Sequence, residues 1–134
     1  MTVQFTGILI ASAELPNVTI PPGLVAVDHP HITLLSSELS RAVRQALRGI
    51  NIAAIDEPFP TVTFGEPYIA DNGTRRTLVC DCVEQAEIRA WLLDAVACLN
   101  LDVTVNESRV YHISVANLTG IQFDSIPDPW NHRQ

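Results

Sequence analysis

The sequence predicts one α+β domain in which antiparallel strands form a sandwich and helices cover one side. Length favours a single domain spanning residues 1–134, because a chain of 134 residues leaves little room for a second one. Composition favours a globular fold, with 47% hydrophobic and 17% charged residues. Periodicity predicts the order β-β-α-β-β-α-β, since short strand-like segments alternate with two segments of helical spacing.

The N-terminal half predicts two strands followed by a helix. Its segments are a strand at 3–11, a proline-rich loop at 12–23, a strand at 30–35 ("PHITLL"), and a helix capped by Ser36 or Ser37 and running to about Leu47. Apolar residues share one face of that helix, and Gly49 terminates it. The helix should therefore pack one face on the sheet and expose the other.

The C-terminal half predicts a hairpin, a second helix and a last strand. Its segments are strands at 61–67 and 75–83, a helix at 84–100, a short strand or connector at 101–105, and a strand at 109–118. Asp71-Asn72-Gly73 is a strong signal for a tight turn before the strand at 75–83. The polar, proline-containing segment from about residue 122 predicts a loosely ordered tail.

The charge of the chain argues against binding to long nucleic acids. The net charge is −7, and every Lys or Arg residue in the chain is an arginine. A protein that follows a duplex normally has a basic stripe, and none is visible. Arg41, Arg44 and Arg48 share a helical face with Glu38 nearby, which is typical of a solvated surface. A small phosphorylated ligand in a local pocket remains compatible with this charge.

The cysteines and the hydropathy predict a cytoplasmic protein without a metal. Three cysteines make no disulfide framework, and Cys80, Cys82 and Cys98 lack the second half of a zinc site, so they are interpreted as small apolar residues. No apolar run is long enough to span a bilayer, and the start lacks the basic region of a secretory signal. We therefore expect no membrane partner. The oligomeric state is left open.

Two histidines occur in the same pattern on two predicted strands. "PHITLL" and "YHISVA" each have a hydroxyl residue two positions after the histidine, with an aliphatic residue between. Alternate strand residues share a face, so His31 lies beside Thr33 and His112 beside Ser114. Each strand can thus bury its aliphatic face and present an imidazole and a hydroxyl to a cleft between two lobes. One such motif alone is typical of a structural histidine, and the matched pair is the stronger signal.

The matched pair resembles the signature of the 2H phosphoesterases, two H-apolar-[Ser/Thr]-apolar motifs on strands that face each other across a cleft. Here the histidines are separated by 112 minus 31, or 81 residues. The resemblance covers most of residues 1–120 in the order of elements, but only the two motifs match at residue level. It implies a bilobal, pseudo-symmetric fold of antiparallel sheets with helices outside. It also implies a phosphodiesterase that needs neither metal nor cofactor.

This resemblance makes four residues the predicted catalytic set, His31, Thr33, His112 and Ser114. One imidazole can take a proton from the attacking water or hydroxyl while the other gives one to the leaving oxygen. The two hydroxyls can donate hydrogen bonds to the non-bridging phosphate oxygens. The assignment of base and acid between the histidines stays open.

Further residues are predicted to contact the substrate. His29 shares parity with His31 and is interpreted as a rim residue, with an H-x-H metal pair as the alternative. Arg75 or Arg76 can reach a phosphate, with a solvated hairpin end as the alternative. Other side chains receive weaker assignments: Arg109 and Tyr111 on the face opposite His112, Trp130 as a lid aromatic, and His132 as a solvated residue of the tail.

The substrates of the 2H family include cyclic mono- and oligonucleotides, 2′,3′-cyclic phosphates at RNA ends and 2′-5′ linkages. The acidic balance of this chain favours a small, soluble nucleotide phosphodiester. Cleavage at RNA ends in RNA processing is the alternative activity. A nucleotide-binding module without turnover is the alternative from another class of protein.

Overall fold

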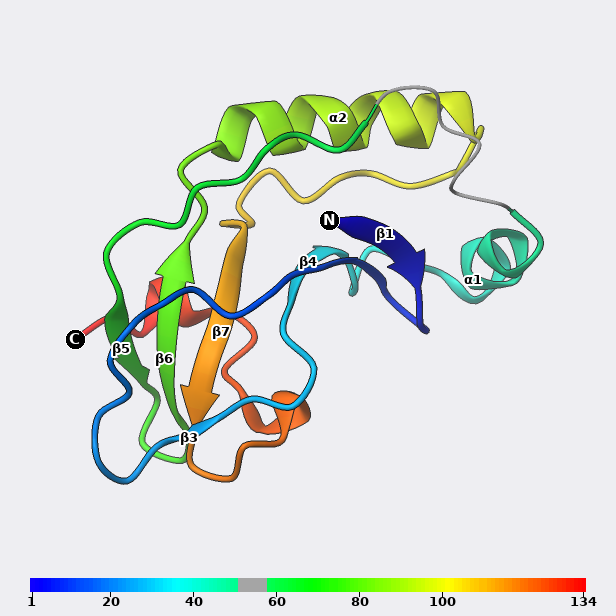
Figure 1. Cartoon of the computed structure of the whole chain (residues 1–134). Coiled ribbons are helices and arrows are strands. Elements are labelled where there is room, and N and C mark those ends of the chain that lie inside the picture. The colour runs from blue at the N-terminus through cyan, green and yellow to red at the C-terminus, as the bar shows by residue number, and fades with distance from the viewer. Residues whose placement is uncertain (51–57) are drawn as a thin grey trace.

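The computed structural model describes residues 1–50 and 58–134 (Figure 1). Its elements are β1 (Thr2–Phe5), β2 (Leu9–Ser12), β3 (Val25–Ala26), β4 (His31–Leu35), α1 (Arg41–Arg48), β5 (Tyr68–Asp71), β6 (Arg76–Asp81), α2 (Gln85–Cys98), β7 (His112–Asn117) and the 3₁₀ helices η2 (Gln122–Asp124) and η3 (Pro129–Asn131). The predicted α+β class is confirmed. Neither of the two α-helices in the described part of the chain is long and apolar enough to cross a membrane.

The strands form one sheet of seven strands in the order β1-β2-β4-β7-β6-β5, with β3 also paired to β7. All of these pairings are antiparallel. The two halves of the sheet, β1-β2-β4 and β7-β6-β5, meet where Ile32 pairs with Ile113. The two halves therefore form one sheet, joined at a narrow seam between the two strands that hold the paired motifs.

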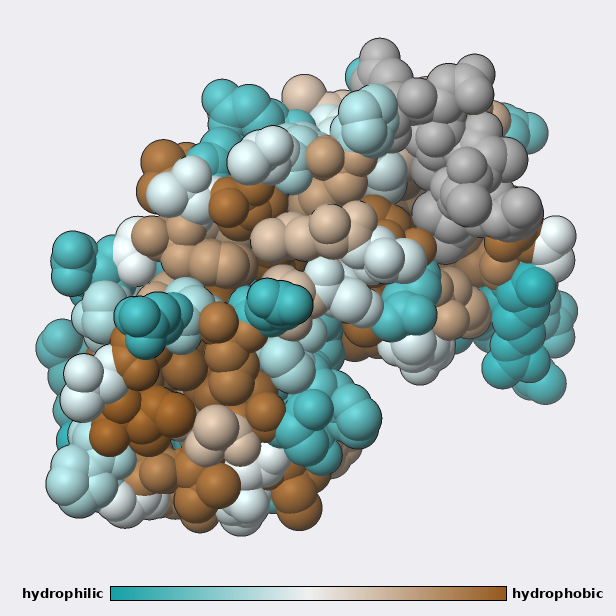
Figure 2. Space-filling view, viewed as in Figure 1, coloured by the Kyte–Doolittle hydropathy of each residue, from teal (hydrophilic) through white to brown (hydrophobic). Residues whose placement is uncertain are grey.

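One face of this sheet is covered along its whole width. α2 packs its buried residues on Ile32 and Leu34 of β4, and α1 packs beside them. Over the other half, residues 13–24 cross β6 and β7 and pack on Ile113 and Val115 (Figure 1). Apolar side chains gather over this crossing segment in Figure 2. Since strand residues alternate between faces, the residues between those aliphatic ones point to the opposite face.

The structure corrects two strand predictions and adds one strand that was not predicted. Residues 3–11 form a hairpin of β1 and β2, because Gly7 turns the chain with a φ of 94°. Residues 61–67 make only a bridge from Phe64 to Cys82, since prolines at 58, 60 and 67 remove backbone donors around it. The two-residue β3 was not predicted. Residues 101–105 run as a connector, one of the two alternatives predicted for them.

The helix and turn predictions hold with shifted boundaries. α1 begins later than predicted because the hydroxyl of Ser40, not that of Ser36 or Ser37, accepts the hydrogen bond from the Val43 amide. The turn at Asp71-Asn72-Gly73 is confirmed, with Gly73 at a φ of 89°. α2 lies inside the predicted range 84–100.

The C-terminal segment is packed, and the prediction of a loosely ordered tail from about residue 122 is wrong. Ile126 is buried against Tyr68 and Val79, and the amide of Ile126 donates to the hydroxyl of Thr77. Farther on, Arg133 bridges to Ala70 of β5. Polar composition suggested a loose tail, but a single buried isoleucine and backbone pairing hold the segment on the sheet.

Candidate active site

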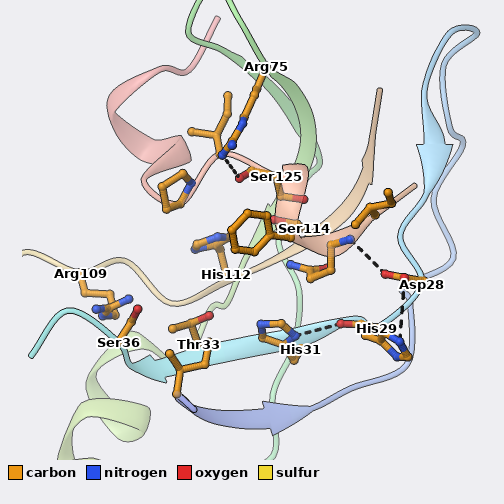
Figure 3. A pocket seen from close by; sticks show the side chains of 16 residues that line it. Asp28, His29, His31, Thr33, Ser36, Arg75, Arg109, His112, Ser114 and Ser125 are labelled. Carbon is orange, nitrogen blue, oxygen red and sulfur yellow. Dashed lines mark hydrogen bonds and ion pairs between the residues drawn. The ribbon is translucent and has the colours of Figure 1, made fainter. Parts of the chain in front are cut away.

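A pocket of about 570 Å³ opens on the face of the sheet that the helices leave uncovered. Both predicted histidines and both predicted hydroxyl residues line it (Figure 3). Its other lining residues are Ile8, Asp28, His29, Ser36, Arg75, Arg109, Ile121, Gln122, Phe123, Ser125, Ile126 and Pro127. The volume lies within the range typical of small-molecule sites, about 300–1,000 Å³.

The strand register explains why the two motifs meet. Ile32 and Ile113 are paired partners, and an antiparallel register keeps the sum of paired residue numbers constant. His31 is therefore opposite Ser114, and Thr33 is opposite His112. Figure 3 shows this square, with His112 above Thr33 and Ser114 above His31. Each imidazole thus has one hydroxyl on its own strand and the other hydroxyl on the facing strand.

Both imidazoles are held by the same local contact. The Nδ1 atom of His31 lies 2.9 Å from the carbonyl oxygen of His29, and that of His112 lies 3.0 Å from the carbonyl oxygen of Val110. A carbonyl oxygen only accepts, so Nδ1 carries the hydrogen in each ring. In the neutral form, each Nε2 then holds a lone pair that can accept a proton.

Burial lowers the pKa of both histidines below the ordinary value of 6.5. For His31 the carbonyl of His29 opposes this effect; for His112 the carbonyl of Val110 and the carboxylate of Asp81 oppose it. Burial in the pocket therefore favours the neutral form of both imidazoles. A bound anion would favour the charged form and raise both pKa values.

His112 has neighbours from two further parts of the chain, the C-terminal segment and β6. The Trp130 ring meets the His112 ring edge to face, with centroids 5.7 Å apart. Asp81 of β6 is the paired neighbour of His112, and its carboxylate accepts a hydrogen bond from the Tyr68 hydroxyl at 2.8 Å. The predicted lid residue Trp130 thus lies on one catalytic candidate, within the segment predicted to be loose.

The segment after β7 forms one wall of the pocket, and this wall was not predicted from the sequence. Residues 121–123 and 125–127 all line the pocket. Asn117 holds this segment, since its amide nitrogen donates to the Ile121 carbonyl and to the Ser125 hydroxyl, at 2.7 and 2.9 Å. On the other side, the Asp28 carboxylate accepts from the Gln122 amide at 3.0 Å. Phe123 is 84% exposed on this wall.

Arg109 was predicted to face away from His112, but it lines the pocket. The prediction extended the alternation of β7 to a residue that lies before the strand begins. Arg109 is buried and forms an ion pair of 2.7 Å with Glu38. Glu38 had been placed with the arginines of α1, and its pairing with Arg109 could not be read from sequence. Tyr111 is buried in the core, as predicted.

The predicted substrate contacts divide into residues inside and outside the pocket. His29 and Arg75 line it, and the His29 side chain is 86% exposed, as a rim position requires. One Arg75 nitrogen donates to the Ser125 carbonyl at 3.4 Å (Figure 3). Arg76 is exposed and is not among the lining residues. His132, predicted to be solvated, is half-buried and 3.5 Å from Asp128.

The thiols lie apart from this site. Cys80 and Cys82 are buried, and burial raises their pKa values to about 11 and about 12, so both stay protonated at neutral pH. Cys98 is exposed on α2. Within residues 1–50 and 58–134, no three His, Cys, Asp or Glu side chains are grouped as metal ligands.

Comparisons with protein-family models, with curated proteins and with solved structures each gave no match. The resemblance of the paired motif to the 2H phosphoesterases therefore stays a prediction, supported by the site alone.

Proposed function

We propose that this protein is a phosphodiesterase of the 2H type that hydrolyses a small nucleotide phosphodiester by general acid and base catalysis. One observation supports the proposal most directly. His31 and His112 line one pocket, each with Nδ1 held by a carbonyl and Nε2 left for proton transfer, and Thr33 and Ser114 lie between them. A phosphate bound at this square would contact two proton-transfer groups and two hydroxyl donors.

The chemistry follows from these groups. One imidazole, neutral, takes a proton from the attacking water as its oxygen bonds to phosphorus. The other, as imidazolium, gives its proton to the leaving oxygen as the bond from phosphorus to that oxygen breaks. The hydroxyls of Thr33 and Ser114 donate to the non-bridging oxygens, whose charge the transition state must hold. Two imidazoles supply both proton transfers, so this reaction requires no metal ion.

The rest of the pocket favours a nucleotide over a bare phosphate ester. Arg75 supplies a cation at one end, beside Ser125 (Figure 3). The wall after β7 adds the exposed apolar side chains of Ile121 and Phe123. An exposed phenyl ring at the pocket wall offers a face on which a base can stack, an interaction that tolerates any base. The preferred substrates are therefore cyclic mono- or oligonucleotides.

Two alternatives have their own support. A 2′,3′-cyclic phosphate at an RNA end has the same phosphodiester, and the exposed rim at His29 is where the rest of an RNA chain would leave the pocket. A binding module without turnover would use the same arginine and apolar wall. The low pKa of both histidines favours this module, because general acid catalysis needs one imidazolium.

A panel of substrates separates these three functions. The protein is incubated with bis-(p-nitrophenyl) phosphate, 2′,3′-cyclic AMP, RNA ending in a cyclic phosphate, and cyclic dinucleotides, with and without EDTA. Turnover that survives EDTA and disappears in His31→Ala and His112→Ala supports the enzyme. His132→Ala is the matched control, since His132 does not line the pocket. Nucleotide binding by calorimetry without any turnover would establish the module and overturn the enzyme.

A further inference from the structure

The ladder between β6 and β7 is interrupted directly beside His112. Asp81 with His112 is the last pair of this ladder, and the same register places Cys82 opposite Tyr111. The Cys82 amide donates to the Tyr111 carbonyl at 2.9 Å. An antiparallel pair of this kind normally closes with a second bond, from the Tyr111 amide to the Cys82 carbonyl. Here that second bond is replaced.

The side chain of Gln85 takes its place. The Tyr111 amide donates to Oε1 of Gln85 at 2.8 Å, and Nε2 of Gln85 donates to the Cys82 carbonyl at 2.8 Å. The same Nε2 also donates to the Tyr111 carbonyl at 2.6 Å. Gln85 is the first residue of α2, so the helix start places this amide between the two strands. The insertion uses both the acceptor and the donor of a primary amide.

The peptide that Gln85 holds is the one that orients His112. The Tyr111 N–H and the Val110 C=O belong to a single planar peptide, in which they point in opposite directions. Fixing the N–H on Gln85 therefore fixes the carbonyl that accepts from Nδ1 of His112 at 3.0 Å. The corresponding peptide before His31 joins His29 to Pro30 and has no N–H, so no side chain can hold it in this way.

We propose that Gln85 is a positioning residue for His112: its amide, inserted between β6 and β7, sets the Val110–Tyr111 peptide and with it the orientation and tautomer of the imidazole. Only the catalytic consequence of this inference rests on the proposed function. Loss of the amide lets the peptide rotate, so the ring loses its carbonyl partner, and Nε2 no longer points at the phosphate with its lone pair.

The test is NMR of the histidine ring nitrogens in protein labelled with ¹⁵N-histidine, above the titration range. In wild type, His31 and His112 should both carry the hydrogen on Nδ1. In Gln85→Ala, His112 should shift toward a mixture of tautomers while His31 stays unchanged. Gln45→Ala is the matched control, since Gln45 is exposed on α1 and should leave both rings unchanged. An unaltered His112 in folded Gln85→Ala overturns the inference.

Two further measurements apply even if Gln85→Ala does not fold. Gln85→Glu keeps the size of the side chain and the acceptor for Tyr111, but as a carboxylate it has no hydrogen for the Cys82 carbonyl, so His112 should again be disturbed. In wild type, the Tyr111 amide should be protected from hydrogen exchange. Exchange as fast as in an exposed loop, or a normal His112 in Gln85→Glu, contradicts the proposed contact.

Kinetics separate this inference from the proposed function. If wild type hydrolyses a phosphodiester, Gln85→Ala should lower kcat by about 100-fold, the loss expected for a misplaced catalytic group, and change KM far less. A rise in the KM of Gln85→Ala without a fall in its kcat contradicts a positioning role. If wild type hydrolyses nothing, the proposed function fails, and the tautomer of His112 still decides the role of Gln85.

Discussion

The two histidine strands share a local design but differ in what surrounds them. In both, a carbonyl two residues earlier accepts from Nδ1. Around His31 the preceding peptide is stiffened by Pro30, whose ring fixes its own backbone angle. Around His112 the corresponding peptide is held by Gln85, and Trp130 covers the ring. One imidazole is thus oriented by its own strand, and the other by residues distant in sequence.

The two motifs therefore present the same chemical groups, but the orientation of each histidine depends on different parts of the chain. The β4 motif should tolerate changes elsewhere in the chain, because its support lies within residues 29–31. The β7 motif should respond to changes in α2 and in the C-terminal segment, since both contact it or its backbone.

The largest effect should come from removing either imidazole. His31→Ala and His112→Ala should each lower kcat by about 10²–10⁴-fold, the usual contribution of a positioned acid or base. Because the two act in one proton-transfer sequence, the double variant should lose little more than the worse single one. Steady-state kinetics on the best substrate measures this. Full additivity of the two losses would argue against a shared site.

The hydroxyls should have the next largest effect. Thr33→Val and Ser114→Ala each remove one donor to the phosphate, which typically costs about 3 kcal/mol of transition-state stabilisation, or about 100-fold in kcat. By the register, each hydroxyl is opposite the histidine of the other strand, so the two losses should be similar. Ser12→Ala on β2, outside the pocket lining, is the control. Unchanged kcat in Thr33→Val would exclude that hydroxyl from phosphate contact.

The sequence predicted which side chains of the two motifs share a face better than it predicted the sheet. Parity along two strands was enough to put His31 and Thr33, and likewise His112 and Ser114, on one face, because alternation is a local property. The facing of the two pairs was implied by the resemblance alone. It depends on the pairing of Ile32 with Ile113, which joins the halves of the sheet across most of the chain.

The elements that were missed depend on contacts that composition does not record. The segment from residue 122 has a polar composition, yet Ile126 is buried and holds it on the sheet. Arg109 was predicted to belong to the last strand, yet it precedes that strand and forms an ion pair with Glu38. Gln85 has no motif at all. Each of these follows from the register between distant segments, which a single sequence does not specify.

Substitution of two neighbouring arginines should have a smaller effect, and only one of the two should change KM. Arg75 lines the pocket and Arg76 is exposed outside it. Arg75→Ala should raise KM for an anionic substrate by about tenfold, since a hydrogen bond to a charged group contributes about 1.5–3 kcal/mol. Arg76→Ala should leave KM near the wild-type value. Equal effects of the two variants would point to a general loss of positive charge.

The smallest effect should be a displacement of one limb of the pH profile. The profile of kcat/KM should be bell-shaped, with both limbs set by pKa values below 6.5, because burial lowers both in the free protein. Trp130→Ala opens the surroundings of His112 to water. Water stabilises imidazolium, so the pKa of His112 should rise toward 6.5 while that of His31 stays in place.

The limb that moves in Trp130→Ala then reports the role of His112. If His112 is the base, it must be neutral. A raised pKa then moves the acidic limb to higher pH, so activity is lost at low pH. If His112 is the acid, it must be charged. A raised pKa then moves the alkaline limb to higher pH, so activity extends to higher pH. NMR titration of the two rings assigns the shift to a residue, because limbs of coupled groups belong to the pair. A shift of His31 instead would contradict the separate enclosure of the two motifs.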